Sequence, residues 1–163
     1  MRAIVTVGLP ACGKSTFAGT LEGEYVELNL DTLRFELSGD AGNQHVTHRA
    51  IGRRKRRLAE LAARGQNVIL SDTHARRRDR RRTIRELQAL GYEVELRFFN
   101  VGERTCQARN QAREHPVPPE VLSRMARRLR ETPPTPDEAD RFTVATEPDD
   151  PLLADLEGPS PAS

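Results

Sequence analysis

Residues 3–16, AIVTVGLPACGKST, decide how this chain folds. The first five are apolar or β-branched, and such a run predicts a buried β-strand. Residues 8–15 fit the pattern G-x-x-x-x-G-K-[ST] at every fixed position, and a helix is expected to begin at Lys14 or Ser15. A strand, a glycine-rich loop and a helix N-terminus, in this order, predict a phosphate-binding loop.

The fixed positions of this loop have physical reasons. Gly8 lets the chain turn sharply off the strand, and Gly13 lets the backbone approach an anion without a Cβ in the way. The N–H groups of the loop and of the first helical turn then face phosphate oxygens. Lys14 is expected to reach the β- and γ-phosphates, and the Ser15 hydroxyl to bind Mg²⁺. The predicted nucleotide-binding residues of the loop are Gly8, Leu9, Pro10, Ala11, Cys12, Gly13, Lys14, Ser15 and Thr16.

The alternative for this loop is an ordinary glycine turn before a helix, with Ser15 near the N-cap.

Composition narrows the class of protein further. The chain has 163 residues, which is the usual size of one domain. Its two cysteines, Cys12 and Cys106, lack a disulfide or metal spacing, which favours a reducing, cytoplasmic compartment. No apolar run approaches the roughly 20 residues that span a bilayer, so no membrane partner is expected.

Strand and helix patterns alternate along the rest of the chain. Strands are expected at residues 25–28, 67–71, 93–100 and 141–145, and helices at 14–21, 32–37, 46–64, 77–90, 101–113 and 119–131. The alternation predicts an α/β fold whose mainly parallel sheet has four or five strands with helices on both faces. Ligands of such sheets bind beyond the C-terminal strand ends, where the loop, Asp31 and Asp72 are expected to gather.

Asp31 and Arg34 lie three residues apart, and therefore on one side of a helical turn. Transfer of phosphate to a hydroxyl needs a carboxylate that orients and deprotonates the attacking oxygen, and it gains from an arginine that holds the acceptor. The alternative is that Asp31 only caps the helix and Arg34 is a surface residue.

Asp72 follows an apolar strand, with the hydroxyl of Thr73 next to it. Three roles are open to Asp72: a contact with Mg²⁺ through water, a salt bridge that aims Arg34, or the N-cap of the next helix. Arg109 and Arg113 are four residues apart on an expected helix, before a proline-broken turn. They are expected to close over the nucleotide and meet the charge of the transition state, unless they are two solvated arginines.

Four stretches together resemble the kinase domain of phage-type polynucleotide 5′-kinases, within the P-loop kinase superfamily: GLPACGKST, NLDTLR, VILSDT and RNQAREHPVPPEVLSRM. The resemblance runs from Gly8 to about Glu131. It implies a P-loop kinase fold with a helical lid, so that residues 1–146 form the kinase domain and residues 147–163 a Pro-rich, acidic tail. The activity that it implies is Mg²⁺-dependent transfer of the γ-phosphate of ATP, or of another NTP, to the 5′-hydroxyl of DNA or RNA.

The resemblance also implies roles at the acceptor side. The residue matching Asp31 is the general base, and the one matching Arg34 binds the 3′-side phosphate of the acceptor. The matches of Asp72 and Thr73 support that arginine and lie at the acceptor site.

On the donor side, the matches of Lys14 and Ser15 serve the triphosphate and the metal ion, and that of Arg113 contacts the donor phosphates. Asp31, Lys14 and Arg113 are thus the expected catalytic residues. Arg109 joins the expected nucleotide-binding group.

Members of this family often carry a C-terminal phosphatase domain, for which this chain ends too soon, so no 3′-phosphatase activity is expected. Their tetramers depend partly on that domain, which leaves a homo-oligomer possible here. The arginine-rich stretches 53–57 and 76–85 fit a polyanionic acceptor or are solvated outer faces. Two rival functions remain: a P-loop kinase of a small hydroxyl compound (nucleoside, sugar or antibiotic), and a non-catalytic nucleotide-binding module.

Overall fold

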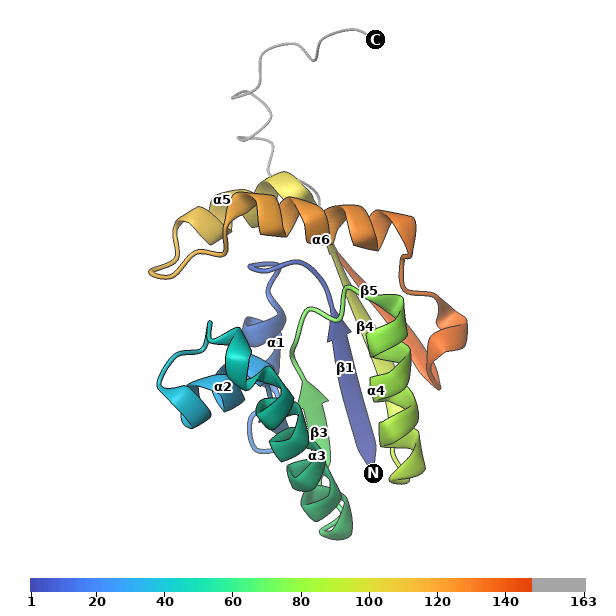
Figure 1. Ribbon diagram of the computed structural model, residues 1–163. Coiled ribbons are helices and arrows are strands. Elements are labelled where there is room, and N and C mark those ends of the chain that lie inside the picture. The colour runs from blue at the N-terminus through green and yellow to red at the C-terminus, as the bar shows by residue number, and fades with distance from the viewer. Residues whose placement is uncertain (148–163) are drawn as a thin grey trace, which may run out of the picture.

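A parallel sheet of five strands, in the order β2-β3-β1-β4-β5, forms the centre of the protein in a computed structural model, which describes residues 1–147 (Figure 1). The strands are β1 (Arg2–Val7), β2 (Tyr25–Leu28), β3 (Asn67–Leu70), β4 (Glu93–Val101) and β5 (Arg141–Glu147). Every pair of neighbouring strands is parallel. The predicted α/β fold with a parallel sheet is therefore confirmed, and so is its last strand.

Helices cover both faces of this sheet, as predicted. They are α1 (Lys14–Thr20), α2 (Leu30–Ser38), α3 (Thr47–Ala63), α4 (Arg77–Ala89), α5 (Glu103–Gln111) and α6 (Pro119–Glu131), with short 3₁₀ turns at Gln44–Val46 and Pro136–Glu138. On one face, Leu58 of α3 and Leu87 of α4 belong to the main hydrophobic core. On the other face, Ala18 of α1 packs with Ile4 and Ile69. Because β1 is the middle strand, its residues from Ala3 to Val7 are all buried.

Helices α5 and α6 cross the C-terminal end of the sheet as a lid over the phosphate-binding loop (Figure 1). Helix α6 begins at Pro119, as predicted, because proline is suited to the first turn of a helix. Helix α5 ends at Gln111, earlier than expected, and Arg113 therefore lies in the turn that follows.

The structure corrects the expected place of several residues. Asn29, and not Asp31, caps α2, since its side chain accepts bonds from the backbone N–H groups of the first turn. Arg54 and Arg80, which the sequence placed on outward faces open to an acceptor or to solvent, are buried at 7% and 0% exposure. Glu147, assigned to the tail, is the last residue of β5.

The rest of the predicted acidic tail, residues 148–163, lies outside the described residues. Across the part of the chain that the structure describes, no helix combines the length and the apolar character that a bilayer crossing requires.

Candidate active site

The phosphate-binding loop joins β1 to α1, and the structure adds a reason for each of its two glycines. A Cβ on Gly8 would lie 2.6 Å from Cys12 Sγ and 3.0 Å from Phe99 Cβ, so close packing against β4 excludes a side chain there. Gly13 has a φ of 101°, in the left-handed region that glycine enters without strain. The loop therefore combines a packed base with an unusual backbone turn at the start of α1.

Lys14 is buried inside this loop, with 7% of its surface exposed. Its Nζ donates to the carbonyl oxygens of Gly8 and Leu9, at 3.0 and 2.6 Å, and lies 3.5 Å from Cys12 Sγ. Burial lowers the pKa of Lys14, and the charge of Arg113 lowers it slightly further, while Cys12 raises it. The carbonyl dipoles around this ammonium group carry no net negative charge, and a bound triphosphate would supply one.

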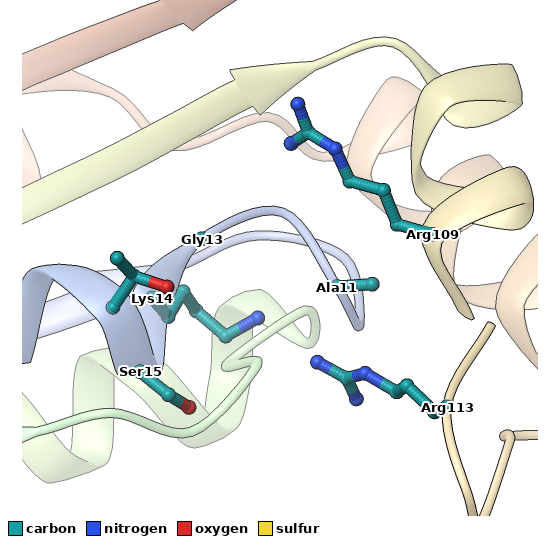
Figure 2. A pocket seen from close by; sticks show the side chains of 7 residues that line it. Ala11, Gly13, Lys14, Ser15, Arg109 and Arg113 are labelled. Carbon is teal, nitrogen blue, oxygen red and sulfur yellow. The ribbon is translucent and has the colours of Figure 1, made fainter.

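The pocket beside Lys14 has a volume of about 280 Å³. Its lining residues come from the loop, from the first turn of α1 and from the lid: Ala11, Gly13, Lys14, Ser15, Thr16, Arg109 and Arg113 (Figure 2). The structure thus brings the two predicted lid arginines to the loop. Of the other predicted nucleotide-binding residues, Gly8, Leu9, Pro10 and Cys12 are buried parts of the loop that do not line this pocket.

The two lid arginines are held differently. Figure 2 shows the guanidinium group of Arg113 pointing towards Lys14, whereas that of Arg109 lies above the loop and turns towards the strand ends. Arg109 forms a two-pronged ion pair with Glu147 at the end of β5, in which Nη1 donates to Oε2 at 3.1 Å. This bond is the main reason why the pKa of Glu147 is lowered.

Asn110 holds the turn that carries Arg113, and sequence reasoning missed it. Its fully buried side-chain amide donates to the carbonyl of Val117 at 2.6 Å and accepts from the N–H of Val117 at 3.0 Å. These bonds close the turn between α5 and α6. An asparagine just before a proline-rich break is the signal that could have indicated this role.

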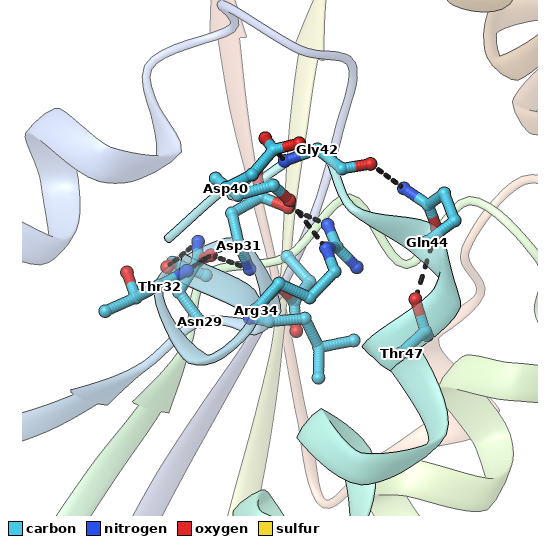
Figure 3. Close-up of polar contacts among 12 residues, drawn as sticks. Asn29, Asp31, Thr32, Arg34, Asp40, Gly42, Gln44 and Thr47 are labelled. Atoms are coloured by element: carbon cyan, nitrogen blue, oxygen red, sulfur yellow. Dashed lines mark hydrogen bonds and ion pairs between the residues drawn. The ribbon is translucent and has the colours of Figure 1, made fainter. Parts of the chain in front are cut away.

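The residues predicted for the acceptor site begin at the first turn of α2. Asn29 Oδ1 accepts from the N–H groups of Asp31 and Thr32, at 2.7 and 3.4 Å, which fixes the start of the helix. Asp31 then forms an ion pair with Arg34, whose Nε also donates to the carbonyl of Ala41 at 2.7 Å (Figure 3). The Asp31 side chain is 66% exposed, and that of Arg34 only 11%. The carboxylate is thus open to a substrate, while the arginine is fixed beside it.

Asp72 lies just after β3 and pairs with Arg54 of α3, so the salt bridge to Arg34, one of the three roles left open for it, is not formed. Arg54 Nη1 donates to Asp72 Oδ2 at 2.7 Å, and the N–H of Leu30 donates to Oδ1 at 2.9 Å. The N-cap role is also wrong for Asp72, because α4 begins only at Arg77. Asp72 therefore joins β3 to the beginning of α2 and to α3.

Thr73 is partly buried and contacts the phosphate-binding loop through its backbone, since its carbonyl accepts from the N–H of Gly8 at 3.1 Å. The pocket beside the loop is lined by Lys14, Ser15, Arg109 and Arg113. Asp31 is not among the residues that line this pocket, and it lies with Arg34 at the start of α2 (Figure 3).

Replacing Lys14 with methionine is expected to change how stability depends on pH. Because burial lowers its pKa from the ordinary 10.5, the folded protein releases this proton at a lower pH than the unfolded chain does. Between these two pKa values the unfolded state binds more protons, so the contribution of Lys14 to stability rises with pH. Lys14→Met should therefore have a higher free energy of unfolding than the wild type at about pH 7, and this difference should be smaller at about pH 10. Urea unfolding at both pH values measures it.

The control for this prediction is Lys55→Met, which replaces the chain's other lysine, 57% exposed beside Glu86. This control is expected to leave the pH dependence unchanged. The same pH dependence in the wild type and in Lys14→Met would contradict the assignment of Lys14 as a buried, destabilised cation.

Comparisons with known proteins bear on the family and on the fold. A family model described as an AAA domain (AAA_33) matches residues 4–132. A search of curated proteins found no match to the sequence.

Solved structures share the fold. A chain of the Pnkp1/Rnl/Hen1 RNA repair complex is 20% identical, with a TM-score of 0.61, over 80% of this chain and 44% of that one. A gluconokinase from Sinorhizobium meliloti 1021 is 19% identical (TM-score 0.59; 95% and 86% of the two chains). A shikimate kinase from Bacteroides thetaiotaomicron is 16% identical (TM-score 0.58; 95% and 93%).

These likenesses show that the chain has the fold of P-loop kinases, a class of domain that binds nucleotides. The chain spans only 40% and 44% of the length of the matched chains in two structures of the Pnkp1/Rnl/Hen1 complex. The neighbours differ in what they act on, so the acceptor has to be argued from the residues of the site.

Proposed function

This chain belongs to the AAA domain family whose model matches residues 4–132, and from that premise we propose that it is a polynucleotide 5′-hydroxyl kinase. It would move the γ-phosphate of ATP, or of another nucleoside triphosphate, to the 5′-hydroxyl end of DNA or RNA in the presence of Mg²⁺. The observation that carries the proposal is the ion pair of Asp31 and Arg34, an exposed carboxylate beside a fixed arginine.

The donor half of the reaction follows from the pocket. Lys14 and Arg113 supply positive charge around the space for a triphosphate, and Arg109 lines the same space while it is paired with Glu147. Such charges stabilise the transition state of phosphoryl transfer, in which negative charge spreads over the transferred group. The Ser15 hydroxyl also lines this pocket, and a hydroxyl together with phosphate oxygens is a ligand set that Mg²⁺ prefers. A bound Mg²⁺ ion would add charge neutralisation at the phosphates.

The acceptor half depends on Asp31. Its carboxylate would take the proton of the acceptor hydroxyl as the new P–O bond forms and the bond between the γ-phosphorus and the bridging oxygen of the nucleoside diphosphate breaks. The side chain is 66% exposed, which leaves room for the hydroxyl. A phosphate next to the acceptor would compete with Asp31 for Arg34 and so free the carboxylate when the correct substrate arrives.

Arg34 is also what favours a nucleic-acid end over a neutral sugar. A 5′-hydroxyl nucleotide in a strand carries a 3′-phosphate close to the reacting hydroxyl, whereas a nucleoside or an uncharged sugar carries none. An arginine that is 11% exposed and held by the Ala41 carbonyl is suited to one fixed anion rather than to general solvation. The second candidate is a kinase of a small hydroxyl compound, which the shared fold with a gluconokinase and a shikimate kinase supports.

A competition assay tests the proposal. Labelled ATP is supplied with Mg²⁺ to an equimolar mixture of a 5′-hydroxyl oligonucleotide, nucleosides, gluconate and shikimate, and the labelled products are separated. The proposal expects the label on the oligonucleotide and none without Mg²⁺. Preferential labelling of a small compound would establish the second candidate. Nucleotide binding with no labelled product would instead indicate a non-catalytic nucleotide-binding module.

Replacing Arg34 with alanine is expected to raise the KM for a 5′-hydroxyl oligonucleotide about ten- to a hundredfold, with the KM for ATP unchanged. The reason is the loss of a charge-assisted hydrogen bond to the acceptor phosphate. The matched control is Arg57→Ala. Arg57 lies on α3 and pairs with Glu36, which is on α2 like Arg34. Steady-state kinetics with each substrate varied in turn measures both constants. An equal rise for ATP and oligonucleotide would show that Arg34 does not belong to the acceptor site.

A further inference from the structure

His74 has an unusual conformation in the segment that follows β3. Its φ is 43°, in the left-handed region that residues with a side chain rarely adopt. Its side chain is nevertheless almost fully buried, at 6% exposure. Strained, buried residues at the edge of a site are candidates for a functional role.

The hydrogen bonds of His74 determine which ring nitrogen carries the proton. Nδ1 lies 2.8 Å from the carbonyl oxygen of Thr6. A carbonyl can only accept, so Nδ1 carries the hydrogen, and in the neutral ring Nε2 is an acceptor. Burial, and to a smaller extent the charge of Arg54, lowers the pKa of His74, although Asp72 opposes this effect, so the ring is neutral near pH 7.

The second nitrogen has no partner. Nε2 is buried and forms no hydrogen bond with any described group. Asp72 Oδ2, which also accepts from Arg54, lies 4.0 Å from Nε2. Both atoms are acceptors and cannot bond to each other, so a group placed between them has to donate twice.

The spacing of these two acceptors suits one water molecule. The hydrogens of a water diverge by about 105°, so two acceptors that each lie about 2.8 Å from its oxygen are roughly 4.4 Å apart. The observed 4.0 Å is close to this span. A buried, unsatisfied acceptor is costly, which gives such a water a reason to bind.

The pair also lies next to the phosphate-binding loop. Thr6 Oγ1 donates to the carbonyl of Asp72 at 3.0 Å, and the N–H of Gly8 donates to the carbonyl of Thr73 at 3.1 Å. Strand β3 is moreover the direct neighbour of β1, which leads into the loop. A water held here would therefore be at the donor edge of the sheet, where the cation of a nucleotide is expected.

We propose that His74 is a positioning residue which, together with Asp72, accepts both hydrogens of one water molecule in the hydration shell of the divalent cation that accompanies the nucleotide. The proposal rests on the nucleotide-binding part of the proposed function and not on the identity of the acceptor. The left-handed backbone at residue 74 turns the ring back so that Nδ1 reaches β1 and Nε2 faces Asp72.

The first test uses the full chain labelled with ¹⁵N-histidine. Its NMR spectrum should show His74 as the neutral tautomer with hydrogen on Nδ1. Adding Mg²⁺ and a non-hydrolysable ATP analogue should shift the Nε2 resonance, and adding the analogue with EDTA should not. A protonated ring, or hydrogen on Nε2, would overturn the proposal. A shift of equal size with EDTA would assign the water to the protein and not to the cation, which also overturns it.

The second test uses His74→Asn. Asparagine tolerates a left-handed backbone and can keep the bond to Thr6, but it has no acceptor at the position of Nε2. The Mg²⁺ concentration needed for binding of the ATP analogue should rise about tenfold, while binding without Mg²⁺ should not change. An unchanged Mg²⁺ requirement would overturn the proposal. If the variant does not fold, the NMR measurement on the wild type still decides. Failure to phosphorylate any oligonucleotide would refute the proposed function without affecting either measurement.

Discussion

Replacing Asp31 with asparagine is expected to slow phosphate transfer to a 5′-hydroxyl oligonucleotide by about 10²- to 10⁴-fold. Asparagine has the same shape but cannot take the proton of the attacking hydroxyl. The affinity for the nucleotide should stay nearly the same, because Asp31 does not line the donor pocket. The fold should also stay the same, since Asn29, and not Asp31, caps α2. Single-turnover transfer measures the rate, and calorimetry with a non-hydrolysable ATP analogue measures binding.

The control is Asp40→Asn, which removes another carboxylate close to α2. Asp40 accepts from the N–H of Gly42 at 2.8 Å, and it has no proposed part in the reaction (Figure 3). This control is expected to retain most of the activity. Full activity in Asp31→Asn would defeat the assignment of the general base, and an equal loss in both variants would point to a disturbed helix.

The second large effect concerns stability. Glu138→Ala is expected to lower the free energy of unfolding by about 3–5 kcal/mol. Arg80 and Glu138 form an ion pair in which both side chains are fully buried, with bonds of 2.7 and 2.8 Å. Removing the carboxylate leaves the Arg80 guanidinium buried with only backbone carbonyls as partners, those of Ala75, Thr132 and Pro133. Urea unfolding followed by circular dichroism measures the loss.

Two further variants locate the cause of this loss. Asp137→Ala removes an exposed partner of the neighbouring Arg81 and is expected to change stability very little. The double variant Arg80→Met with Glu138→Leu replaces both buried charges by apolar side chains and should recover most of the stability. A loss below about 1 kcal/mol in Glu138→Ala would show that the buried pair does not hold residues 132–138 against α4.

Local patterns predicted most of the fold. The strand Tyr25–Leu28 and the helix Pro119–Glu131 have the bounds that the sequence predicted, because alternation, apolar period and proline act within a few residues. The phosphate-binding loop was predictable for the same reason, since its spacing is local.

The partners of the buried arginines were not predictable in this way. Arg54 lies in a run of basic residues that the sequence placed on an outward face, yet it shares the apolar stripe of α3 with Ala50 and Leu58. The helical period of this stripe was the missed signal. Its partner, Asp72, is 18 residues away on another element, and Glu138 is 58 residues from Arg80. Only the packing of distant segments sets such pairs, which explains why Arg54 was not among the partners expected for Asp72.

The two hydrogen bonds between Asn110 and Val117 have a consequence for nucleotide affinity. They make the turn that carries Arg113 rigid before any nucleotide arrives. A preorganised turn loses its conformational entropy during folding, so binding does not bear that cost again. On binding a triphosphate, Arg113 then has to order its side chain but not the backbone turn that carries it.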